Sequence, residues 1–349
     1  MAVVHVLVAL AGALAILTAL LEAVKAFVVP RGLSVPFTRL VLRSVFWSVR
    51  TLAYLRGARD RATRDAYTAY SAPIGVLMLP AAWLVASLLG YAGIFWAIDG
   101  GPFGRAFVVS GSSLFTLGFD RPPGVGGAIT AFSESAVGLG LLAIVISYLP
   151  SLNTAFARRE SVVATLDARA GTPPDAVTLI ERHHVFAGIE HLDVLWPEWE
   201  KWIVEVGESH FTHPMLAFFR SSDPEHSWVT AIVALLDAAN FRLSAVQASG
   251  AGNAGAWMFY RAGIGVVARL SGFFGGRIRV EEHRTIHTQT EFEAVLARFR
   301  EIGVRVVEDW DGAWERFARR RAEYEPVIER LSALVDAPPS EWRISDIPR

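Results

Sequence analysis

The sequence predicts an all-α protein made of an integral membrane part followed by a soluble helical part. Hydrophobic residues make up 52% of the 349-residue chain and charged residues only 19%, which is too apolar for a soluble protein of this length. The long apolar runs all lie in residues 1–150, which carry eleven basic and six acidic side chains, whereas residues 151–349 carry 22 basic and 28 acidic ones. This asymmetry predicts a boundary near Pro150.

Three apolar segments, residues 3–29, 73–98 and 128–149, are long enough to span a membrane. A hydrocarbon core of about 30 Å takes about 20 helical residues. The first segment lacks the basic start and the small-residue cleavage site of a signal peptide, so we expect a retained helix. We expect Pro80 to kink the second segment and Pro150 to end the third.

The connectors predict the orientation. The first connector contains eight Arg and only two acidic residues, and the pair Arg158 and Arg159 follows the third segment. By the positive-inside rule both regions are cytoplasmic, so the N-terminus and the loop 99–127 face outward from the plasma (inner) membrane. Residues 33–55 mix apolar and Arg side chains, which is typical of a helix lying on anionic inner-leaflet lipid. A helix packed on the cytoplasmic domain fits the same pattern.

The outer loop carries the sequence SGSSLFTLGFD at residues 110–120. Residues 107–115 are apolar and small enough for a short re-entrant helix, after which the chain turns back and leaves through Arg-Pro-Pro-Gly. Non-helical backbone at membrane depth is tolerated only where it is buried in protein or lines a watery cavity. A Thr-x-Gly-aromatic turn between membrane helices aims backbone carbonyl oxygens at a dehydrated cation.

The order of outer span, short helix, Thr-x-Gly-Phe turn, Pro-containing exit and inner span resembles the pore module of the tetrameric potassium-channel superfamily, specifically its two-helix bacterial type. The resemblance covers roughly residues 73–160. It implies a homotetramer, since one loop lines only a quarter of a filter, and a permeant monovalent cation, first of all K⁺. Carried over by residue, it assigns the innermost hydroxyl and carbonyl ligands to Thr116, the middle carbonyls to Leu117 and Gly118, and the outer carbonyl to Phe119, whose ring would be anchored behind the filter.

Asp120 stands where the family's filter has its second glycine, and two alignments are open. In the first, Asp120 occupies the glycine position and adopts a left-handed conformation, which Asp reaches at modest cost. A ring of carboxylates would then concentrate cations at the mouth and weaken the selection of potassium over sodium. In the second alignment one glycine is deleted, the filter is shorter, and Asp120 is the acid that follows it.

The inner span adds candidate gating residues. Gly138 and Gly140 lie at mid-helix, where small residues permit a bend or a close approach of two helices. Tyr148 and Pro150 lie at the predicted cytoplasmic end, and gating in the resembling family uses such places.

Glu134 is an ionisable residue inside a span, which is costly and indicates a cavity or a partner. We expect it behind the filter, bonded to Ser112, Ser113 or the region of Asp120. A position near the outer interface, with the carboxylate in water, is the other reading.

The second half reads as helices separated by Gly and Pro turns. The predicted helices are residues 153–170, 174–195, 198–207, 227–248 and 309–335. Only residues 277–281 look strand-like, so the alternating strands and helices of a nucleotide-binding domain are not expected. The motif GAGNAG at 250–255 does not follow a strand, so we interpret it as an interhelical loop.

Glu208, His210 and His213 are the candidates for a metal site, because imidazole and carboxylate groups are common ligands. Their spacing matches no established zinc signature, so hydrogen-bonded structural roles are the default and no cofactor is expected. The chain has no Cys, which excludes disulfides and thiolate chemistry. No catalytic motif is present, so we expect no enzyme, and we expect no nucleic-acid partner.

The predicted organisation has five parts. They are an N-terminal span at 1–30, an Arg-rich interfacial region at 31–72, a pore module at 73–152 (outer helix 73–98, pore helix and filter 104–121, inner helix 128–150), a cytoplasmic helical domain at 153–337 and a loose tail at 338–349. The expected function is a cation channel whose soluble domain assembles or regulates the gate. The alternatives are a non-conducting membrane-anchored sensor or scaffold and, more remotely, a membrane hydrolase using the His cluster.

Overall fold

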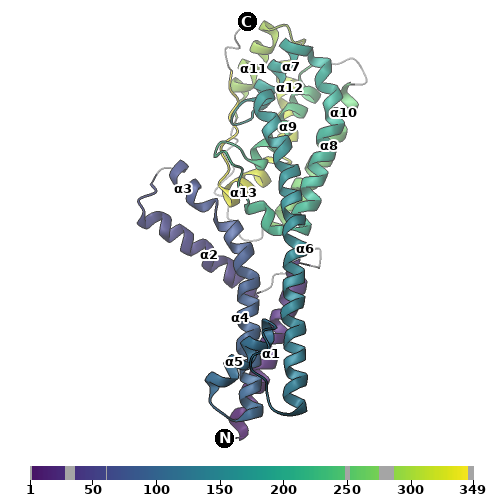
Figure 1. The fold of residues 1–349 in the computed structure, drawn as a ribbon. Coiled ribbons are helices and arrows are strands. Elements are labelled where there is room, and N and C mark those ends of the chain that lie inside the picture. Colours follow the sequence, from purple (N-terminus) through teal and green to yellow (C-terminus); the bar gives the residue numbers. More distant parts are fainter. Residues whose placement is uncertain (1, 28–35, 60, 248–251, 275–286, 345–349) are drawn as a thin grey trace. The chain divides into compact units, whose positions relative to one another are not determined.

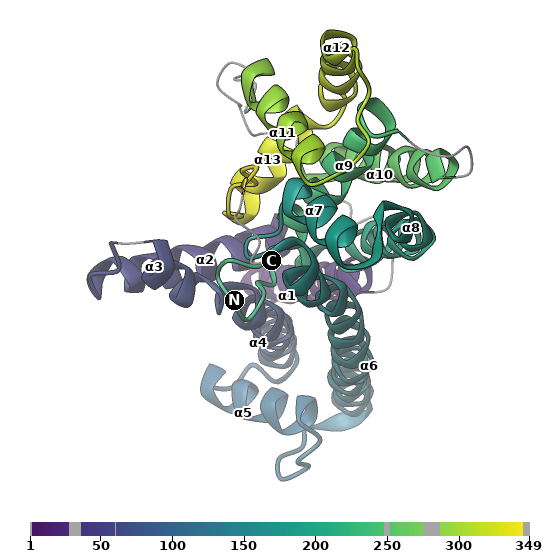
Figure 2. The same ribbon diagram turned by 90° about the horizontal axis from the view of Figure 1, so that it is seen from above.

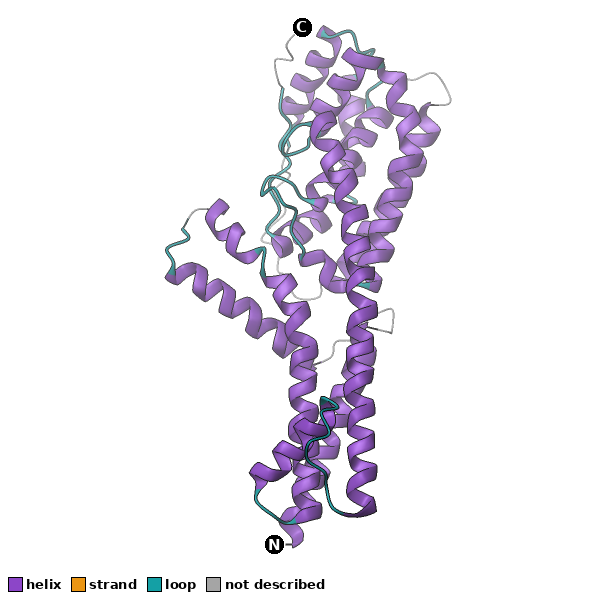
Figure 3. Ribbon diagram, viewed as in Figure 1, coloured by secondary structure: helices purple, strands orange, loops and turns teal. Residues whose placement is uncertain are grey.

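A computed structural model describes residues 2–27, 36–59, 61–247, 252–274 and 287–344, and their regular structure is helical (Figure 3). The elements are α1 (Ala2–Phe27), α2 (Pro36–Leu55), α3 (Arg61–Thr68), α4 (Ser71–Asp99), α5 (Phe103–Leu114), α6 (Gly124–Ala170), α7 (Ala176–Ala187), α8 (Ile189–Thr212), the 3₁₀ helix η1 (Pro214–Phe218), α9 (Trp228–Ser244), α10 (Gly252–Phe274), α11 (Gln289–Glu301), α12 (Trp310–Arg321) and α13 (Glu325–Val335). By length and composition, three helical stretches can cross a membrane, namely Ala2–Ala26, Ala66–Asp99 and Gly124–Ala170. The predicted all-α membrane protein is therefore confirmed, while the strand-like residues 277–281 lie outside the described residues.

The chain folds as two compact units. Unit 1 comprises Met1–Thr154 and Thr212–Phe219, and unit 2 comprises Ala155–Phe211 and Arg220–Arg349. The first change of unit lies two residues from the boundary that the sequence predicts. The return of Thr212–Phe219 to unit 1 is a feature that the local sequence pattern does not contain.

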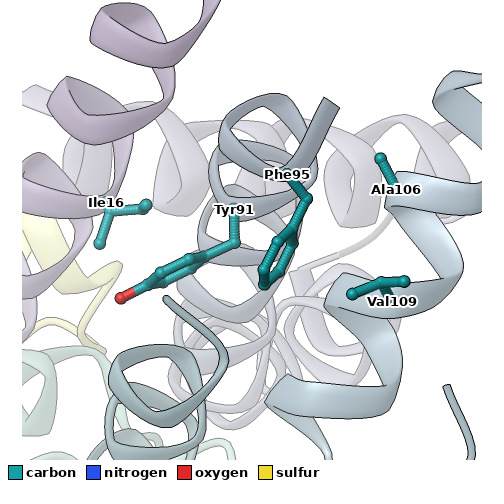
Figure 4. Packing of buried hydrophobic residues seen from close by; sticks show 5 residues of the cluster. All are labelled: Ile16, Tyr91, Phe95, Ala106 and Val109. Atoms are coloured by element: carbon teal, nitrogen blue, oxygen red, sulfur yellow. The ribbon is translucent and has the colours of Figure 1, made fainter. Parts of the chain in front are cut away.

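Unit 1 is built around α4, which packs against both α1 and α5 (Figure 1). Figure 4 shows Tyr91 and Phe95 of α4 between Ile16 of α1 and the α5 side chains Ala106 and Val109, and all five are buried. Aromatic side chains of α4 thus fill the space on either side of this helix and fix the position of α5.

Helices α1 and α4 cross where two glycines face each other. A Cβ added to Gly12 would collide with the carbonyl oxygen of Gly90, and a Cβ added to Gly90 would lie 2.8 Å from the carbonyl oxygen of Gly12. Small residues at a crossing let two backbones approach closely, which is how helices associate when lipid surrounds them. This contact sets the distance between the two helices.

We expect Gly12→Ala to destabilise unit 1 by about 1–3 kcal/mol, because its methyl group would be forced against a backbone carbonyl that has no room to move. Gly104→Ala is the matched control, since a Cβ there meets nothing within 4 Å. Alanine is the better helix former by about 1 kcal/mol, so the control should be neutral or stabilising. Thermal unfolding of the two purified variants checks this, and equal melting temperatures would contradict the crossing.

The buried Glu22 of α1 caps the N-terminus of α2, the first helix of the Arg-rich region. Its carboxylate accepts hydrogen bonds from the backbone N–H groups of Phe37 (3.0 Å) and Thr38 (2.7 Å) and from the Thr38 hydroxyl (2.9 Å). These N–H groups belong to the first turn of α2, where they have no partner within the helix. A carboxylate at this end also meets the positive end of the helix dipole. The predicted single region at 31–72 contains two helices, α2 and α3, within its described residues, and its last two residues already belong to α4.

Two prolines do not end helices as the sequence predicts. Helix α6 continues through Pro150 to Ala170, and α8 continues through Pro197 to Thr212. A proline inside a helix removes one hydrogen bond, which the many bonds of a long helix can offset. The predicted helix at 174–195 instead ends at Ala187, because Gly188 takes a positive φ of 83°.

Other predicted boundaries of the second half are also wrong. Helices α10 and α11 are missing from the prediction, and α12 and α13 are separate although one helix was expected at 309–335. Gly252–Gly255 of the GAGNAG motif form the start of α10, whereas residues 250 and 251 lie outside the described residues.

The core of unit 2 is α9, which contacts α7, α10, α12 and α13 (Figure 2). Its fully buried Asp237 accepts hydrogen bonds from Arg321 (2.7 Å), from the Tyr324 hydroxyl and from the Trp342 indole (3.0 Å). Burial raises the pKa of Tyr324, so this phenol keeps its proton and donates a hydrogen bond to the carboxylate. A charged group at the centre of the unit is thereby fully paired.

The predicted loose tail at 338–349 is wrong for its described part. The Trp342 ring stacks on His287 at 3.7 Å and packs against Phe241, while Arg343 donates to the Thr172 carbonyl (2.8 Å). An indole that both fills a hydrophobic site and donates to Asp237 fixes the segment to the core. Residues 345–349 lie outside the described residues.

Candidate functional site

The candidate site is the loop 115–123, which joins α5 to α6 in unit 1. In Figures 1 and 3 the chain leaves the end of α5, turns, and runs back to the end of the unit at which α6 begins. Helix α5 is held by buried apolar contacts with α4. A rigid short helix therefore supports a turn of irregular backbone.

The first residues of the loop close the C-terminus of α5 with a Schellman motif. The N–H of Thr116 donates to the Ser113 carbonyl (3.1 Å) and the N–H of Leu117 donates to the Ser112 carbonyl (2.8 Å). Thr116 has a φ of 55°, the left-handed region in which glycine is usual at this position. For a β-branched residue this is an outlier costing about 1–2 kcal/mol, and such strain is concentrated at functional sites.

The same hydrogen bonds orient the carbonyl groups of the loop. In a trans peptide the N–H of one residue and the carbonyl of the residue before it point in opposite directions. The N–H groups of Thr116, Leu117 and Gly118 all donate to the Ser112 and Ser113 carbonyls at the end of α5. The carbonyl groups of Phe115, Thr116 and Leu117, which share peptide groups with these N–H groups, consequently point away from α5.

A further carbonyl is turned outward by the tether at the other end of the loop. Ser112 Oγ accepts from the Asp120 N–H (3.2 Å) and donates to the Asp120 carbonyl (3.3 Å). The Phe119 carbonyl, which shares a peptide group with that N–H, therefore points away from Ser112. Across the described chain, no hydrogen bond is accepted by the carbonyl oxygens of Thr116, Leu117, Gly118 or Phe119.

Asp120 does not adopt the left-handed conformation that the first alignment requires. Positive φ occurs at Thr116 and at Gly118 (71°), but Asp120 has none. Its carbonyl is bound by Ser112, and its carboxylate accepts from the N–H of Arg121 at 2.8 Å. The outward-facing carbonyls therefore end at Phe119.

The expectation that the Phe119 ring is anchored behind the loop is wrong for the single chain. The Phe119 side chain is 67% exposed and Leu117 is 63% exposed. The loop is instead held directly against α5 by its hydrogen bonds to Ser112 and Ser113. Both apolar side chains are thus directed away from the rest of the described chain.

Glu134 is fully buried against α5, and its hydrogen-bond partner is not one of the predicted ones. Its Oε1 lies 2.5 Å from the Ser110 hydroxyl, which also lies 2.8 Å from the Leu88 carbonyl. The expected bond to Ser112, Ser113 or Asp120 is not formed. The next residue of α6, Ser135, donates to the Ser113 carbonyl instead (2.7 Å), so the register of α6 places Glu134 one turn further from the loop. The sequence contained a signal for this contact: Ser110 and Ser113 are three residues apart and so lie on one face of a helix, which α6 could contact.

The donor count at Ser110 is informative. A hydroxyl has one hydrogen, yet its two neighbours, the Leu88 carbonyl and the Glu134 carboxylate, are both acceptors. Both contacts are hydrogen bonds at the same time only if the carboxyl carries a proton and donates to Ser110. Glu134 of α6, Ser110 of α5 and the Leu88 carbonyl of α4 then form a continuous chain of hydrogen bonds.

We expect Glu134→Gln to retain the stability of unit 1 to within about 1 kcal/mol, because an amide N–H₂ also donates to Ser110. Glu134→Ala should cost about 2–5 kcal/mol, since it leaves a cavity and an unpaired hydroxyl. Thermal unfolding in lipid or detergent measures both, with Thr130→Ala, whose hydroxyl bonds only the Gly126 carbonyl of its own helix, as the control. Equal losses in the Gln and Ala variants would contradict the donor role.

The candidate gating residues have different surroundings. A Cβ on Gly138 would collide with the Leu114 carbonyl, so this glycine allows α6 to approach the end of α5, whereas a Cβ on Gly140 meets nothing within 4 Å. Pro150 is exposed within α6, and Tyr148 is buried with its ring 5.0 Å from that of His213. Close packing at Gly138 and a side-chain contact at Tyr148 are therefore the observed roles.

The three candidate metal ligands do not meet. Glu208 is exposed and pairs with Arg269 at 3.2 Å, while the buried His210 lies against Trp228 with Nδ1 2.7 Å from the Val206 carbonyl. His213 belongs to unit 1, unlike the other two. Among the described residues, no group of three or more His, Cys, Asp or Glu side chains could hold a metal ion.

Comparisons with known proteins add nothing to this geometry. No protein-family model, curated protein or solved structure matches the chain.

Proposed function

We propose that this chain is the pore-forming subunit of a cation channel, in which four copies build a filter from Thr116–Asp120. The observation that carries the proposal is the orientation of the loop. Its N–H groups are bound to α5 and Ser112, which directs the carbonyls of Thr116, Leu117 and Phe119 away from the protein that holds them. Carbonyl oxygens without a hydrogen-bond donor can replace the hydration shell of a cation.

Four copies are required because one loop supplies only a quarter of such a ring. Exposed carbonyls would be costly in hydrocarbon, so the loop is tolerable there only around a wet axis. The strained Thr116 and the tether between Ser112 and Asp120 supply the rigidity that a coordination site needs. The permeant ion is a monovalent cation, first of all K⁺.

The remaining elements take their places from this pore. The loop and the N-terminus face outward, because the Arg-rich connectors remain in the cytoplasm. Helix α2 lies on the inner leaflet, where Arg43 and Arg50 meet anionic lipid and exposed apolar side chains such as Trp47 enter the acyl boundary. Unit 2 is then a cytoplasmic domain that assembles or regulates the channel.

One observation favours the alternative of a non-conducting membrane-anchored sensor or scaffold. Leu117 and Phe119 do not pack behind the loop of their own chain, so the loop depends on Ser112 for its closure at the outer end. In a vestigial pore these side chains would simply meet lipid or a partner protein.

Ion flux separates the two functions. The full chain is reconstituted into vesicles loaded with K⁺, and efflux is followed with a potassium electrode at several voltages and pH values. The channel predicts efflux above that of protein-free vesicles. Absence of efflux under every condition, from protein that is tetrameric and thermally stable, would favour the scaffold.

A further inference from the structure

Residues Thr212–Phe219, here called the docking segment, return from unit 2 to unit 1. The chain enters the segment directly from α8 and leaves it at Arg220, so both of its ends are covalently continuous with unit 2. The segment contains the 3₁₀ helix η1, whose Leu216 and Ala217 are buried. It contacts α4, where a Cβ on Gly75 would lie 3.6 Å from the terminal methyl of Met215.

His213 of the docking segment contacts the third spanning helix. A ring nitrogen of His213, Nε2, lies 3.1 Å from Ser151 Oγ, and the ring lies edge-on to Tyr148 with centroids 5.0 Å apart. His213 is only 7% exposed, and burial lowers the pKa of its imidazole below the ordinary value of 6.5, so the ring is neutral at pH 7. A neutral imidazole can share one hydrogen with the Ser151 hydroxyl.

These two contacts lie on opposite sides of Pro150 in the sequence of α6. Pro150 has no N–H, so the carbonyl four residues earlier, that of Ile146, lacks its usual helical donor. A helix bends most readily at such a point. The docking segment therefore holds α6 where the helix itself is weakest.

We propose that His213 is a positioning residue that fixes the inner end of α6, and that the docking segment is an element, beside the continuous helix α6, through which unit 2 acts on the pore. This inference rests on the proposed channel function. Movement at the end of α8 or at Arg220 would pull His213 away from Tyr148 and Ser151 and leave α6 free to bend at Pro150. The filter, which lies at the other end of α6, would keep its geometry.

The experiment measures docking and conduction separately. Hydrogen exchange is recorded for peptides covering residues 144–154 and 212–219 in the full chain in lipid nanodiscs, and single-channel recordings give open probability, conductance and ion selectivity. The variants are His213→Ala, His213→Gln and Ser151→Ala. Ser147→Ala is the matched control, because its hydroxyl is exposed and bonds only the Ile144 carbonyl of its own helix.

We expect His213→Ala and Ser151→Ala to accelerate exchange in both peptides, on the order of fivefold to tenfold. Open probability should change severalfold, whereas conductance and selectivity should not, and His213→Gln should restore the parent behaviour through its amide. Ser147→Ala should leave exchange and open probability as in the parent.

Three outcomes would overturn the inference or its basis. Unchanged exchange in His213→Ala would show that the segment is not held by this residue. Faster exchange with an unchanged open probability would remove the coupling while leaving the docking in place. If His213→Ala exchanges faster than the parent but the parent conducts no ions, the proposed function would be overturned and the docking would stand.

Discussion

Gly118→Asp is expected to reduce cation flux to the level of protein-free vesicles. Gly118 has a φ of 71°. Asp reaches this left-handed conformation more readily than most residues with a side chain, but it still costs on the order of 1 kcal/mol more than glycine, and a tetramer would bear that cost at four positions. Space is not the obstacle, since a Cβ there meets nothing within 4 Å. The turn would instead relax to negative φ, and its carbonyls would no longer face the ion.

Two controls separate this effect from a loss of folding. Gly104→Asp adds the same side chain in a place where a Cβ also meets nothing within 4 Å, and there the backbone has no positive φ. That variant should conduct like the parent. Size-exclusion chromatography and thermal unfolding should show that Gly118→Asp remains assembled. Normal flux through assembled Gly118→Asp would contradict a filter made of this loop.

The spanning helices could be predicted from the sequence, but their ends could not. Apolar length alone determines which segments can cross a membrane, and all three predicted segments are helical in their described residues. The sequence predicts an end at Pro150, because proline is disfavoured in helix interiors. The prediction failed because residues 151–170 are rich in the good helix formers Ala, Leu, Arg and Glu, and the hydrogen bonds of this stretch offset the one that proline removes.

The long-range contacts of the site could be predicted only in part. Local pattern identified Thr116, Gly118 and Glu134, since each is unusual where it stands. It did not identify Ser110, because serine is unremarkable in a short helix and its role depends on the register between α5 and α6. His213 was grouped with His210 by closeness in sequence, yet the two belong to different units.

The C-terminal segment shows the same limit. Residues 338–349 are polar and rich in proline, which favours a loose tail, and that average concealed one aromatic side chain. Trp342 buries its ring in unit 2 and donates to the only acidic residue of α9, Asp237. A single Trp in a polar segment is thus a better indicator of docking than the composition of the segment.

Asp120→Gly is expected to reduce potassium flux severalfold at low ionic strength and to leave the ratio of potassium to sodium permeability unchanged. The Asp120 carbonyl is bound by Ser112 and its φ is not left-handed, so this residue does not replace the missing glycine of a filter. Its four carboxylates in a tetramer would act on ions at the mouth, where they raise the local cation concentration. The Debye length, beyond which salt screens a charge, is about 3 Å at 1 M salt and about 30 Å at 0.01 M. The loss of flux should therefore vanish at high salt.

Asp120→Asn distinguishes the charge of Asp120 from its backbone. Asparagine removes the carboxylate and keeps a side chain that accepts from the Arg121 N–H, as Asp120 does at 2.8 Å. If charge is the cause, Asn and Gly variants lose the same flux at 10 mM salt and recover it together at 1 M. If Asp120 occupied a glycine position, the Gly variant alone would select potassium more strongly, because a left-handed residue 120 in each of the four chains would add a further ring of carbonyls at the mouth. The permeability ratio of the two variants therefore decides where the filter ends.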